Sequence, residues 1–490
     1  MRPRISYCTL ILATYLLVSG CINLGPDYSR PDVQVDIPVA YQYTPTVAKP
    51  LEIEDRWWTV FKDPEIDRLI DQALRYNWDI KQAAARVLEA RAQFVQVRAN
   101  RFPSVDVQGS GDRRRFGGPR SASGTTVNTY ELAAPAVFEI DLWSRLAKTS
   151  QAAWDDILQA ETNRHTVAQT IVAETVTLYL QLEASERRLQ IAYQSIEAFR
   201  RSLQFVDTRY SRGLTSALDV RQARRILAGA EALVPQFQQQ LGIIQQQLSI
   251  LLGQYPETRE ARIQPEDYYK RLEPVPPGLP SSLLMRRPDI QAAEYRLKAI
   301  NERVGAAKAA RFPTITLTGS YGWTSDELSS LIEPDNVIWN LTGGIVQPVF
   351  DAGKLKARQR TAEALYLQGV AGYAKTLLAA FQEVESALLT RKMQLERRKR
   401  ELKFLEEARA TQRVAQNRYV HGLSDYLDVL DAQQTRFIAE DSLVLVDLGI
   451  YSNRVSLHRS LGGSWVRPET ITTKDDGIFF DFVANPQKQE

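Results

Sequence analysis

The residues best suited to chemistry in this sequence are few, and their spacing does not indicate catalysis. His165, His421 and His458 are the only histidines, and none has neighbours at metal-ligand spacing. The sequence contains no nucleophile elbow, no phosphate-binding loop and no pair of carboxylates in a cleft-like setting. It therefore predicts neither an enzyme nor a bound metal or cofactor.

The most distinctive acidic residues follow the second of two similar glycine turns. Asp425, Asp428 and Asp431 stand in the stretch RYVHGLSDYLDVLDA, which covers Arg418–Ala432. Leu427 and Asp431 are four residues apart, so they share one face of a helix. Repeated around a pore, such carboxylates would bind cations. The alternative for Asp425 and Asp428 is an ordinary favourable charge in a first helical turn.

Cys21 provides a different kind of chemistry, a site for covalent lipid. Arg2 and Arg4 precede the apolar run Leu10–Val18, which is typical of a secretory signal and too short to span a bilayer as a helix. The sequence LVSGC that follows looks like a lipobox, so we expect Cys21 to become the lipidated first residue of the mature chain. Ile22, where an Asp would hold a lipoprotein at the inner membrane, favours the outer membrane. The alternative is a plain signal with an incidental cysteine.

The charge balance argues against a nucleic-acid partner. Lysine and arginine number 61 against 58 aspartate and glutamate, and the formal net charge is +3. This balance gives no broad electrostatic attraction for a polyanion. The densest basic cluster, Arg113–Arg115, stands among Gly, Ser and Pro, and we interpret it as part of a solvated loop rather than a binding patch.

The chain contains an internal duplication. Arg209–Ala223, RYSRGLTSALDVRQA, repeats the features of Arg418–Ala432 at an offset of 209 residues. Gly213 and Gly422 suit the left-handed residue that ends a helix. Residues able to cap the next helix follow each glycine: Thr215 and Ser216, and then Ser424. Other segments match at nearly the same offset over some four hundred residues, which is strong support for two copies of one structural unit.

Hydrophobic periodicity predicts the same order of elements in each half: helix, two strands, a very long helix, the turn and a closing helix. Helices are expected over about 65–100, 144–207 and 217–252, then from the second set of strands to Asn417 and over 425–461. Alternating apolar residues predict strands at 104–108, 128–142, 314–323 and 337–350, with loops at 111–126 and 324–336. Pro235 lies inside a closing helix and should kink or split it.

Four strands per chain are too few to close a barrel. Open sheet edges cannot lie in lipid, because unpaired backbone groups cost several kcal/mol each. If the strands span a membrane, several chains must share one barrel. A tube of long helices would likewise be extended by oligomerisation.

Several motifs together resemble the TolC-like outer membrane factors, specifically the lipidated outer membrane channels of tripartite efflux systems of the resistance–nodulation–division type. They are GPDYSRP at 25–31, WWTVFKDP at 57–64, DLWSRL at 141–146, RPDI at 287–290 with Ala293-Glu294, and the paired turns. The resemblance covers essentially the whole mature chain. Ser144 departs from it, because the family usually has a glycine at this strand-to-helix turn, which Gly353 keeps in the second half.

The resemblance implies a mainly α-helical fold with a membrane β-barrel. A homotrimer would pool twelve strands into an outer membrane barrel, continued by a periplasmic α-helical barrel of twelve helical strands. The implied domains are a signal peptide (1–20), a lipid-anchored extended segment (21–64), a first repeat (65–253, strands about 103–142, tip about 209–216), a linker (254–282), a second repeat (283–462, strands about 313–350, tip about 418–425) and a C-terminal tail (463–490).

The resemblance also implies where the functional residues lie. The two tips would dock the periplasmic adaptor of an inner-membrane pump, and the residues assigned to this role are Arg209, Gly213, Leu214, Arg418, Gly422 and Leu423. Apolar and acidic rings after the second tip form the periplasmic gate in this family, and Leu427, Asp428 and Asp431 match them. The loops at 111–126 and 324–336 would be extracellular.

The implied function is a passive exit duct, anchored in the outer membrane, that expels drugs or toxic small molecules. The same fold could instead serve type I protein secretion or metal-ion efflux. An alternative of another class is a lipid-anchored coiled-coil scaffold that never crosses the membrane. A scaffold would explain the long helices but not the alternating segments where each short helix meets a long one.

Overall fold

The computed structural model describes residues 24–32, 41–43, 56–117, 125–265, 269–270, 272 and 286–463. Cys21, the predicted signal and the predicted C-terminal tail beyond residue 463 lie outside these residues. The chain forms two compact units, and each takes segments from both repeats. The first unit holds residues of 1–35, 84–162 and 290–376, and the second those of 36–83, 163–289 and 377–490.

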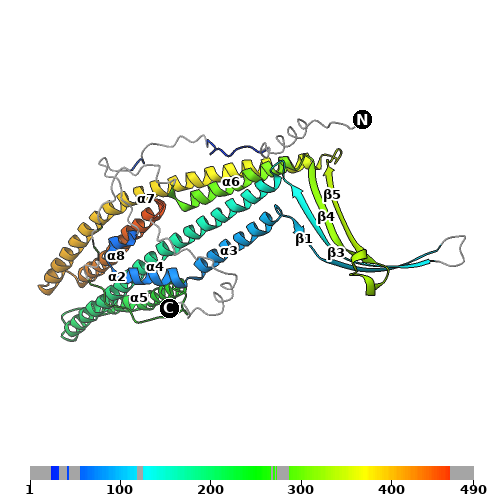
Figure 1. Cartoon of the computed structure of the whole chain (residues 1–490). Helices are drawn as coiled ribbons and strands as arrows, with labels where there is room; N and C mark the ends of the chain where they lie inside the picture. The colour runs from blue at the N-terminus through cyan, green and yellow to red at the C-terminus, as the bar shows by residue number, and fades with distance from the viewer. Residues whose placement is uncertain are drawn as a thin grey trace. The chain divides into compact units, whose positions relative to one another are not determined.

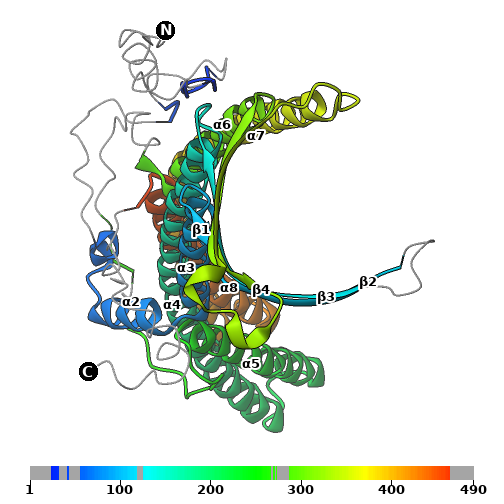
Figure 2. The ribbon, with the colours of Figure 1, turned by 45° about the vertical axis from the view of Figure 1, so that its right-hand side comes forward.

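The first unit contains one antiparallel sheet (Figure 1). Its strands are β1 (Ser104–Val105), β2 (Gln108–Phe116), β3 (Thr125–Ile140), β4 (Thr314–Ser325) and β5 (Val337–Val346). β1 and β2 both pair with β3, and the order continues through β4 to β5. Short 3₁₀ turns, η3 (Leu328–Ser330) and η4 (Pro334–Asn336), connect β4 to β5. Figure 2 shows the three long strands curving together.

Two strand boundaries differ from the sequence-based expectation. Gly111–Phe116 lies in β2, where a loop was expected, and Arg113 pairs with Asn128 of β3. The interpretation of Arg113–Arg115 as part of a loop was therefore wrong, because pairing with β3, the next strand in the chain, outweighs the weak strand propensity of this Gly- and Arg-rich segment. β5 ends at Val346 rather than near residue 350. Pro348 follows, and a proline has no N–H to donate to a ladder.

Pro135 explains why β1 and β2 are two strands. Ser104 pairs with Val137, Val105 with Ala136, and Gln108 with Ala133, so the register is continuous across the gap. Asp106 and Val107, which lie in the gap, face Pro135 and Ala134. The missing N–H of Pro135 removes one ladder bond there, although Asp106 N still donates to Pro135 O at 3.0 Å.

The helices flank the strands in sequence. They are η1 (Trp57–Phe61), α2 (Pro64–Tyr76), α3 (Trp78–Ala99), α4 (Arg145–Ser211), α5 (Ala217–Leu251), α6 (Pro288–Ala309), α7 (Lys354–Val420) and α8 (Tyr426–Ser460). α4 and α7 are 67 residues long, which confirms the predicted long helices. Within the described ranges, every helix is too short or too polar to be a candidate membrane span.

Two helix predictions need correction. The expected single helix over 65–100 is broken at Asn77, whose Oδ1 accepts from Asp79 N at 2.9 Å and so caps α3. Pro235 does not split its helix, since α5 runs unbroken from Ala217 to Leu251. A helix can absorb one internal proline, because only one backbone hydrogen bond is removed and the neighbouring turns remain intact.

The strand-to-helix turns of the two repeats share a left-handed residue. Ser144 has φ +58° before α4, and Gly353 has φ +84° before α7. In each turn an aspartate accepts from the helix N-terminus: Asp141 Oδ2 from Ala147 N at 2.7 Å, and Asp351 Oδ2 from Leu355 N at 2.8 Å. Ser144 therefore adopts the backbone conformation that favours glycine.

Candidate functional site: the two helix tips and the groove beside them

The two predicted tips have the same backbone geometry. In the first, Leu214 N donates to Arg209 O at 2.9 Å and Gly213 has φ +69°. In the second, Leu423 N donates to Arg418 O at 2.8 Å and Gly422 has φ +72°. In each tip the residue after the glycine donates its backbone N–H to the carbonyl of the residue five positions before the donor, which is the Schellman motif. Both glycines therefore end their helices, as the sequence predicted.

The tips differ in how the next helix begins. Ser216 caps α5 in a capping box with Asp219, in which each side chain bonds the other's backbone N–H. The cap of α8 is Asp425, not Ser424 as the sequence suggested, and it makes no side-chain capping bond. The first turn of α8 is consequently held by packing rather than by its cap.

The residues predicted to form the gate lie on the solvent-facing side of α8. Leu427 is 50% exposed, and Asp428 and Asp431 are exposed as well. The residues between them are buried against the first hairpin and α7, in a cluster comprising Val206, Val220, Ala223, Ala415, Tyr419, Tyr426, Val429, Leu430 and Ala432. Packing of this cluster turns the apolar and acidic side chains outward together.

The residues assigned to adaptor docking divide into two groups. Leu214 and Leu423 are 60% and 67% exposed, and each follows its tip glycine. The two arginines instead brace the tips: Arg209 lies with its guanidinium carbon 5.1 Å from the centre of the Tyr419 ring, and Arg418 Nη2 donates to Leu423 O at 3.0 Å. Of the residues assigned to docking, the two leucines are thus the exposed apolar ones, and Leu218 and Val420, 64% and 54% exposed, lie close by in sequence.

A hydrogen bond that sequence reasoning missed joins the two hairpins. The hydroxyl groups of Tyr426 on α8 and Ser202 on α4 lie 2.9 Å apart. Tyr426 is buried, and its ring centre is 5.2 Å from that of Tyr419. Burial raises the pKa of Tyr426 to about 12, so its hydroxyl keeps its proton. One feature of the sequence could have indicated a role for Tyr426: the first repeat has Ala217 at the equivalent position, so the tyrosine is not part of the repeated pattern.

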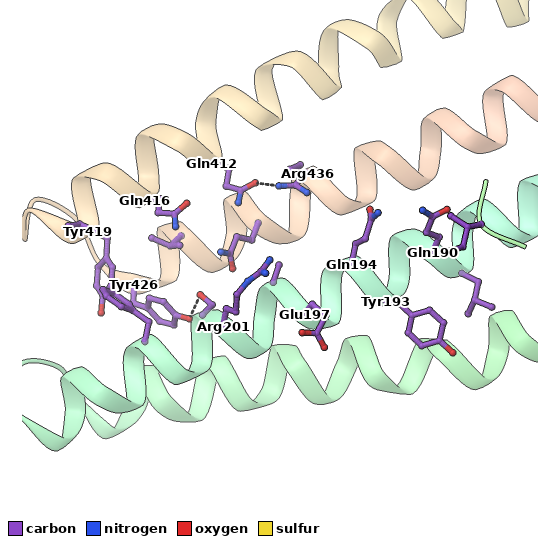
Figure 3. Close-up of a pocket in the computed structure, with 18 of the residues that line it drawn as sticks. Gln190, Tyr193, Gln194, Glu197, Arg201, Gln412, Gln416, Tyr419, Tyr426 and Arg436 are labelled. Carbon is purple, nitrogen blue, oxygen red and sulfur yellow. Dashed lines mark hydrogen bonds between the residues drawn. The ribbon is translucent and has the colours of Figure 1, made fainter. Parts of the chain in front are cut away.

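This bond lies at one end of a groove between α4 and the α7–α8 hairpin (Figure 3). The groove has a volume of about 1040 Å³. Its lining is rich in amide, hydroxyl and guanidinium groups, among them Gln190, Gln194, Arg201, Gln412, Gln416 and Arg436. Arg436 Nη1 donates to Gln412 Oε1 at 3.1 Å, which ties α8 to α7 along the groove. Apolar side chains such as Leu189, Phe205 and Val429 also line it, so the groove presents both polar and apolar surface.

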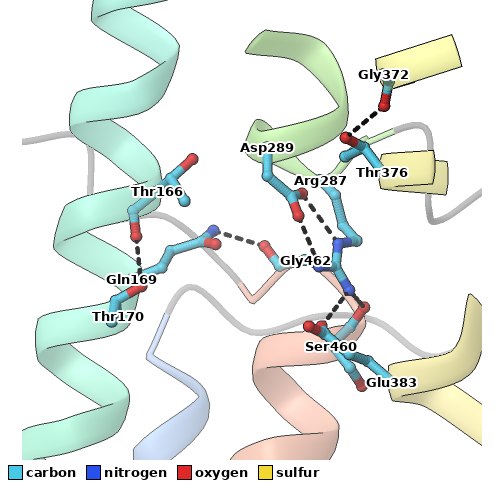
Figure 4. Close-up of polar contacts among 10 residues, drawn as sticks. All are labelled: Thr166, Gln169, Thr170, Arg287, Asp289, Gly372, Thr376, Glu383, Ser460 and Gly462. Atoms are coloured by element: carbon cyan, nitrogen blue, oxygen red, sulfur yellow. Dashed lines mark hydrogen bonds and ion pairs between the residues drawn. The ribbon is translucent and has the colours of Figure 1, made fainter. Parts of the chain in front are cut away.

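The far ends of the closing helices are held by residues at equivalent places in the repeats. Asn77 Nδ2 donates to Leu251 O at 3.0 Å at the end of α5. Arg287 Nη1 donates to Ser460 O at 2.9 Å at the end of α8 (Figure 4). The Arg287 guanidinium also pairs with Asp289 at 2.7 Å and Glu383 at 2.9 Å. The RPDI motif therefore anchors α8 at the end opposite to its tip.

A buried acidic group lies deeper in this helical unit. Burial and then the charge of Asp63 raise the pKa of Glu183 to about 7. Asp63 caps α2 and also accepts from the Tyr179 hydroxyl at 2.7 Å. Nearby, Glu186 accepts from Arg262 Nε at 3.1 Å and from Gln264 Nε2 at 2.7 Å. Among the described residues, no cluster of three or more His, Cys, Asp or Glu side chains is placed to hold a metal ion.

Known proteins are similar to this chain over both of its repeats. The sequence model of the outer membrane efflux protein family matches residues 69–254 and 279–463, one match for each repeat. The chain is 31% identical over 466 residues to the cation efflux system protein CusC of Escherichia coli O6:H1, covering 94% of this chain and 99% of the relative. It is 32% identical over 466 residues to the toluene efflux pump outer membrane protein TtgI of Pseudomonas putida, covering 93% and 98%.

Solved structures of outer membrane channels have a similar fold. The outer-membrane channel OprN superposes with a TM-score of 0.82 at 31% identity, covering 90% of this chain and 99% of that channel. Both repeats of the sequence, with their helices and strands, are therefore shared with proteins of one kind. The chain belongs to the outer membrane efflux protein family.

Proposed function

We propose that three copies of this chain form the exit duct of a tripartite efflux pump, through which drugs or other toxic small molecules pass from the periplasm to the exterior. The observation that carries this proposal is the form of the sheet. It has a broad exposed apolar face, with Trp339, Leu341 and Ile345 at 74%, 68% and 71% exposure. Its strands run at one end into helices of 67 residues.

The apolar face suits contact with lipid, because a sheet in water would expose such a face only at a large free-energy cost. β2 and β5 are the edge strands of the sheet. Open edges are costly in lipid, and pairing the β5 edge of one copy with the β1–β2 edge of the next would close a barrel. With β1 and β2 counted as one strand, because their register on β3 is continuous, three copies, as in the family resemblance, give twelve strands.

The tips are the proposed docking point for the adaptor of an inner-membrane pump. Leu214 and Leu423 would contact it, since both are largely exposed beyond a rigid Schellman turn. Leu427, Asp428 and Asp431 would form the periplasmic gate. In a trimer each carboxylate would become a ring of three, which favours cations over anions in a narrow pore.

Cys21 is the proposed lipid attachment site, on the strength of its lipobox-like sequence. Intact-mass measurement of the mature protein tests this role. Wild type should carry the mass of a diacylglyceryl group and an N-linked acyl chain on a chain that begins at residue 21. Cys21→Ser should leave the signal uncleaved and unlipidated, and an unlipidated wild type would remove the anchor from the proposal.

Metal ions are the second candidate cargo, because CusC, with which the chain aligns over nearly its whole length, is named a cation efflux protein. TtgI is named for toluene at a similar identity. Loss of the gene in its host separates the two: sensitivity to dyes, detergents and solvents supports organic cargo, whereas sensitivity confined to metal cations supports metal efflux.

Single-channel conductance of the purified protein in a planar bilayer tests the duct itself. We expect small cation-selective steps and an oligomer that migrates faster on gels before heating than its mass predicts, as barrels do. An oligomer without conductance and without heat-dependent migration would favour the lipid-anchored scaffold instead.

A further inference from the structure

The sheet carries two arginines on its apolar face, beyond the end of the apolar band. We propose that Arg113 and Arg115 bind the phosphate groups of outer-leaflet lipid and so fix the depth of the sheet in the outer membrane. This inference rests on the proposed function, because it requires the sheet to span that membrane. It concerns a lipid site, which is separate from the conduction path.

The strand register assigns each side chain to a face. In an antiparallel pair, directly opposed residues point to the same side of the sheet, and successive residues alternate. Leu132 of β3 opposes Trp323 of β4, and Tyr321 opposes Trp339 of β5. One face therefore carries an apolar band, made of Tyr130, Leu132, Ala134, Ala136, Phe138 and Ile140, Ile315, Leu317, Tyr321 and Trp323, and Val337, Trp339, Leu341 and Ile345.

The same register places the arginines. Gly111 opposes Tyr130, Arg113 opposes Asn128 and Arg115 opposes Thr126. Arg113 and Arg115 thus share the face of the apolar band and follow it toward the β2–β3 turn. Arg114 points to the other face, where it pairs with Asp112 at 2.6 Å. Neither Arg113 nor Arg115 forms an ion pair within the part of the chain that the structure describes, and both side chains are exposed.

The dimensions of the band fit a bilayer. Ile140 to Tyr130 covers ten intervals of about 3.3 Å along β3, and a strand tilt of about 40° reduces the height to about 25 Å, the height of an outer membrane apolar band. Arg113 then lies about 5 Å beyond the band and Arg115 about 10 Å beyond it. The polar headgroup layer adds about 5–8 Å on each side of the hydrocarbon core. The Arg113 backbone lies within this layer, and the Arg115 backbone lies just beyond it, from where its long side chain can reach back to the phosphates.

The end of the sheet identifies the leaflet. β3 leads into α4 at its Ile140 end, so the β2–β3 turn is at the opposite end from the helices. The β2–β3 hairpin also continues beyond β4, whose pairing with β3 stops at Tyr130 and Ser325 (Figure 1). If the helices are periplasmic, the arginines face the outer leaflet, whose phosphorylated glycolipid offers oxyanions that match the fork of a guanidinium.

The experiment measures retention of lipid by the purified full-length protein. Native mass spectrometry would count diphosphoryl lipid A bound per chain, against the same glycolipid with its phosphates removed. We expect wild type to prefer the diphosphoryl form and Arg113→Gln with Arg115→Gln to lose at least about tenfold in its apparent affinity, since both charged hydrogen-bond forks are gone. Arg113→Lys with Arg115→Lys should lie between them.

Arg113→Gln alone provides the charge match for the control variant Arg114→Gln, which removes one positive charge from the next residue, on the opposite face. Retention equal to wild type in Arg114→Gln supports a site on the lipid face. Equal loss in Arg114→Gln and in Arg113→Gln, or no loss in the double variant, would overturn the proposal. Conductance in a planar bilayer is recorded for every protein: persistent conductance with no phosphate preference rejects the lipid site alone, whereas absent conductance in wild type rejects the spanning sheet and the site with it.

Discussion

The hydroxyl groups of Tyr426 and Ser202 lie 2.9 Å apart, and this single bond connects the α7–α8 hairpin to α4 close to its tip. It lies between the apolar cluster near the tip and the groove that runs beyond it. A bond at that border is well placed to hold the two hairpins together while the tip is closed.

Tyr426→Phe removes this bond and keeps the buried ring. The loss of one buried hydrogen bond costs about 1 kcal/mol, so we expect the closed arrangement to weaken and the single-channel open probability to rise about fivefold. Tyr193→Phe is the control, because the Tyr193 hydroxyl accepts from Gln238 Nε2 at 3.0 Å within the first hairpin. Equal effects of the two substitutions would show that Tyr426 has no special role.

Asp428→Ala with Asp431→Ala tests the proposed gate. Both carboxylates are exposed on the same side of α8 as Leu427, so their removal should leave folding unchanged. We expect the ratio of cation to anion permeability, measured from reversal potentials in a salt gradient, to fall severalfold and the conductance to rise. The control is Asp207→Ala, an exposed aspartate near the first tip. Unchanged selectivity in the double variant would move the gate elsewhere.

Ser144→Gly should stabilise the protein. Ser144 has φ +58°, a left-handed conformation that costs a residue with a Cβ about 1 kcal/mol relative to glycine. The reciprocal change, Gly353→Ser at φ +84°, should destabilise the folded protein by a similar amount or more. Because a Cβ at this position meets no atom within 4 Å, this substitution tests the backbone conformation alone. Thermal unfolding in detergent measures both. A lower unfolding temperature for Ser144→Gly would contradict the strain.

Glu183 should make stability depend on pH. Its pKa is about 7 in the folded chain against 4.5 for a free glutamate, so the folded state binds more protons between these values and stability falls as pH rises from 4.5 to 7. The full effect is about 3 kcal/mol. Glu183→Gln should flatten this slope and raise the unfolding temperature at pH 8. Glu174→Gln, an exposed change on the same helix, is the control, and an unaltered slope in Glu183→Gln would refute the assignment.

Much of the fold could be predicted from local patterns. Gly213 and Gly422 end their helices as expected, because a left-handed cap depends on one residue and its neighbours. The long helix α4 follows from a segment without glycine or proline, and the strand alternation of Thr314–Trp323 reappears in β4. The repeated order of elements needed only the constant offset between the halves.

The features that were missed depend on partners distant in sequence. Arg113–Arg115 looks like a loop until Asn128 and its neighbours pair with it. Asn77 ends α2 because its side chain is engaged by Leu251 O and by the first turn of α3. The Tyr426–Ser202 bond joins residues 224 positions apart, and the hydrophobic periodicity of neither helix predicts it.

Asn77 and Arg287 hold the ends of equivalent helices in the two repeats, but the chemistry of the two contacts differs. Asn77 holds the end of α5 with a neutral amide, whereas Arg287 holds the end of α8 with a guanidinium that also neutralises Asp289 and Glu383. A recombinant chain with an asparagine in place of Arg287 would leave two carboxylates without their cation. The two repeats are therefore not interchangeable at this position, because an exchange would separate the guanidinium from the two carboxylates with which it pairs.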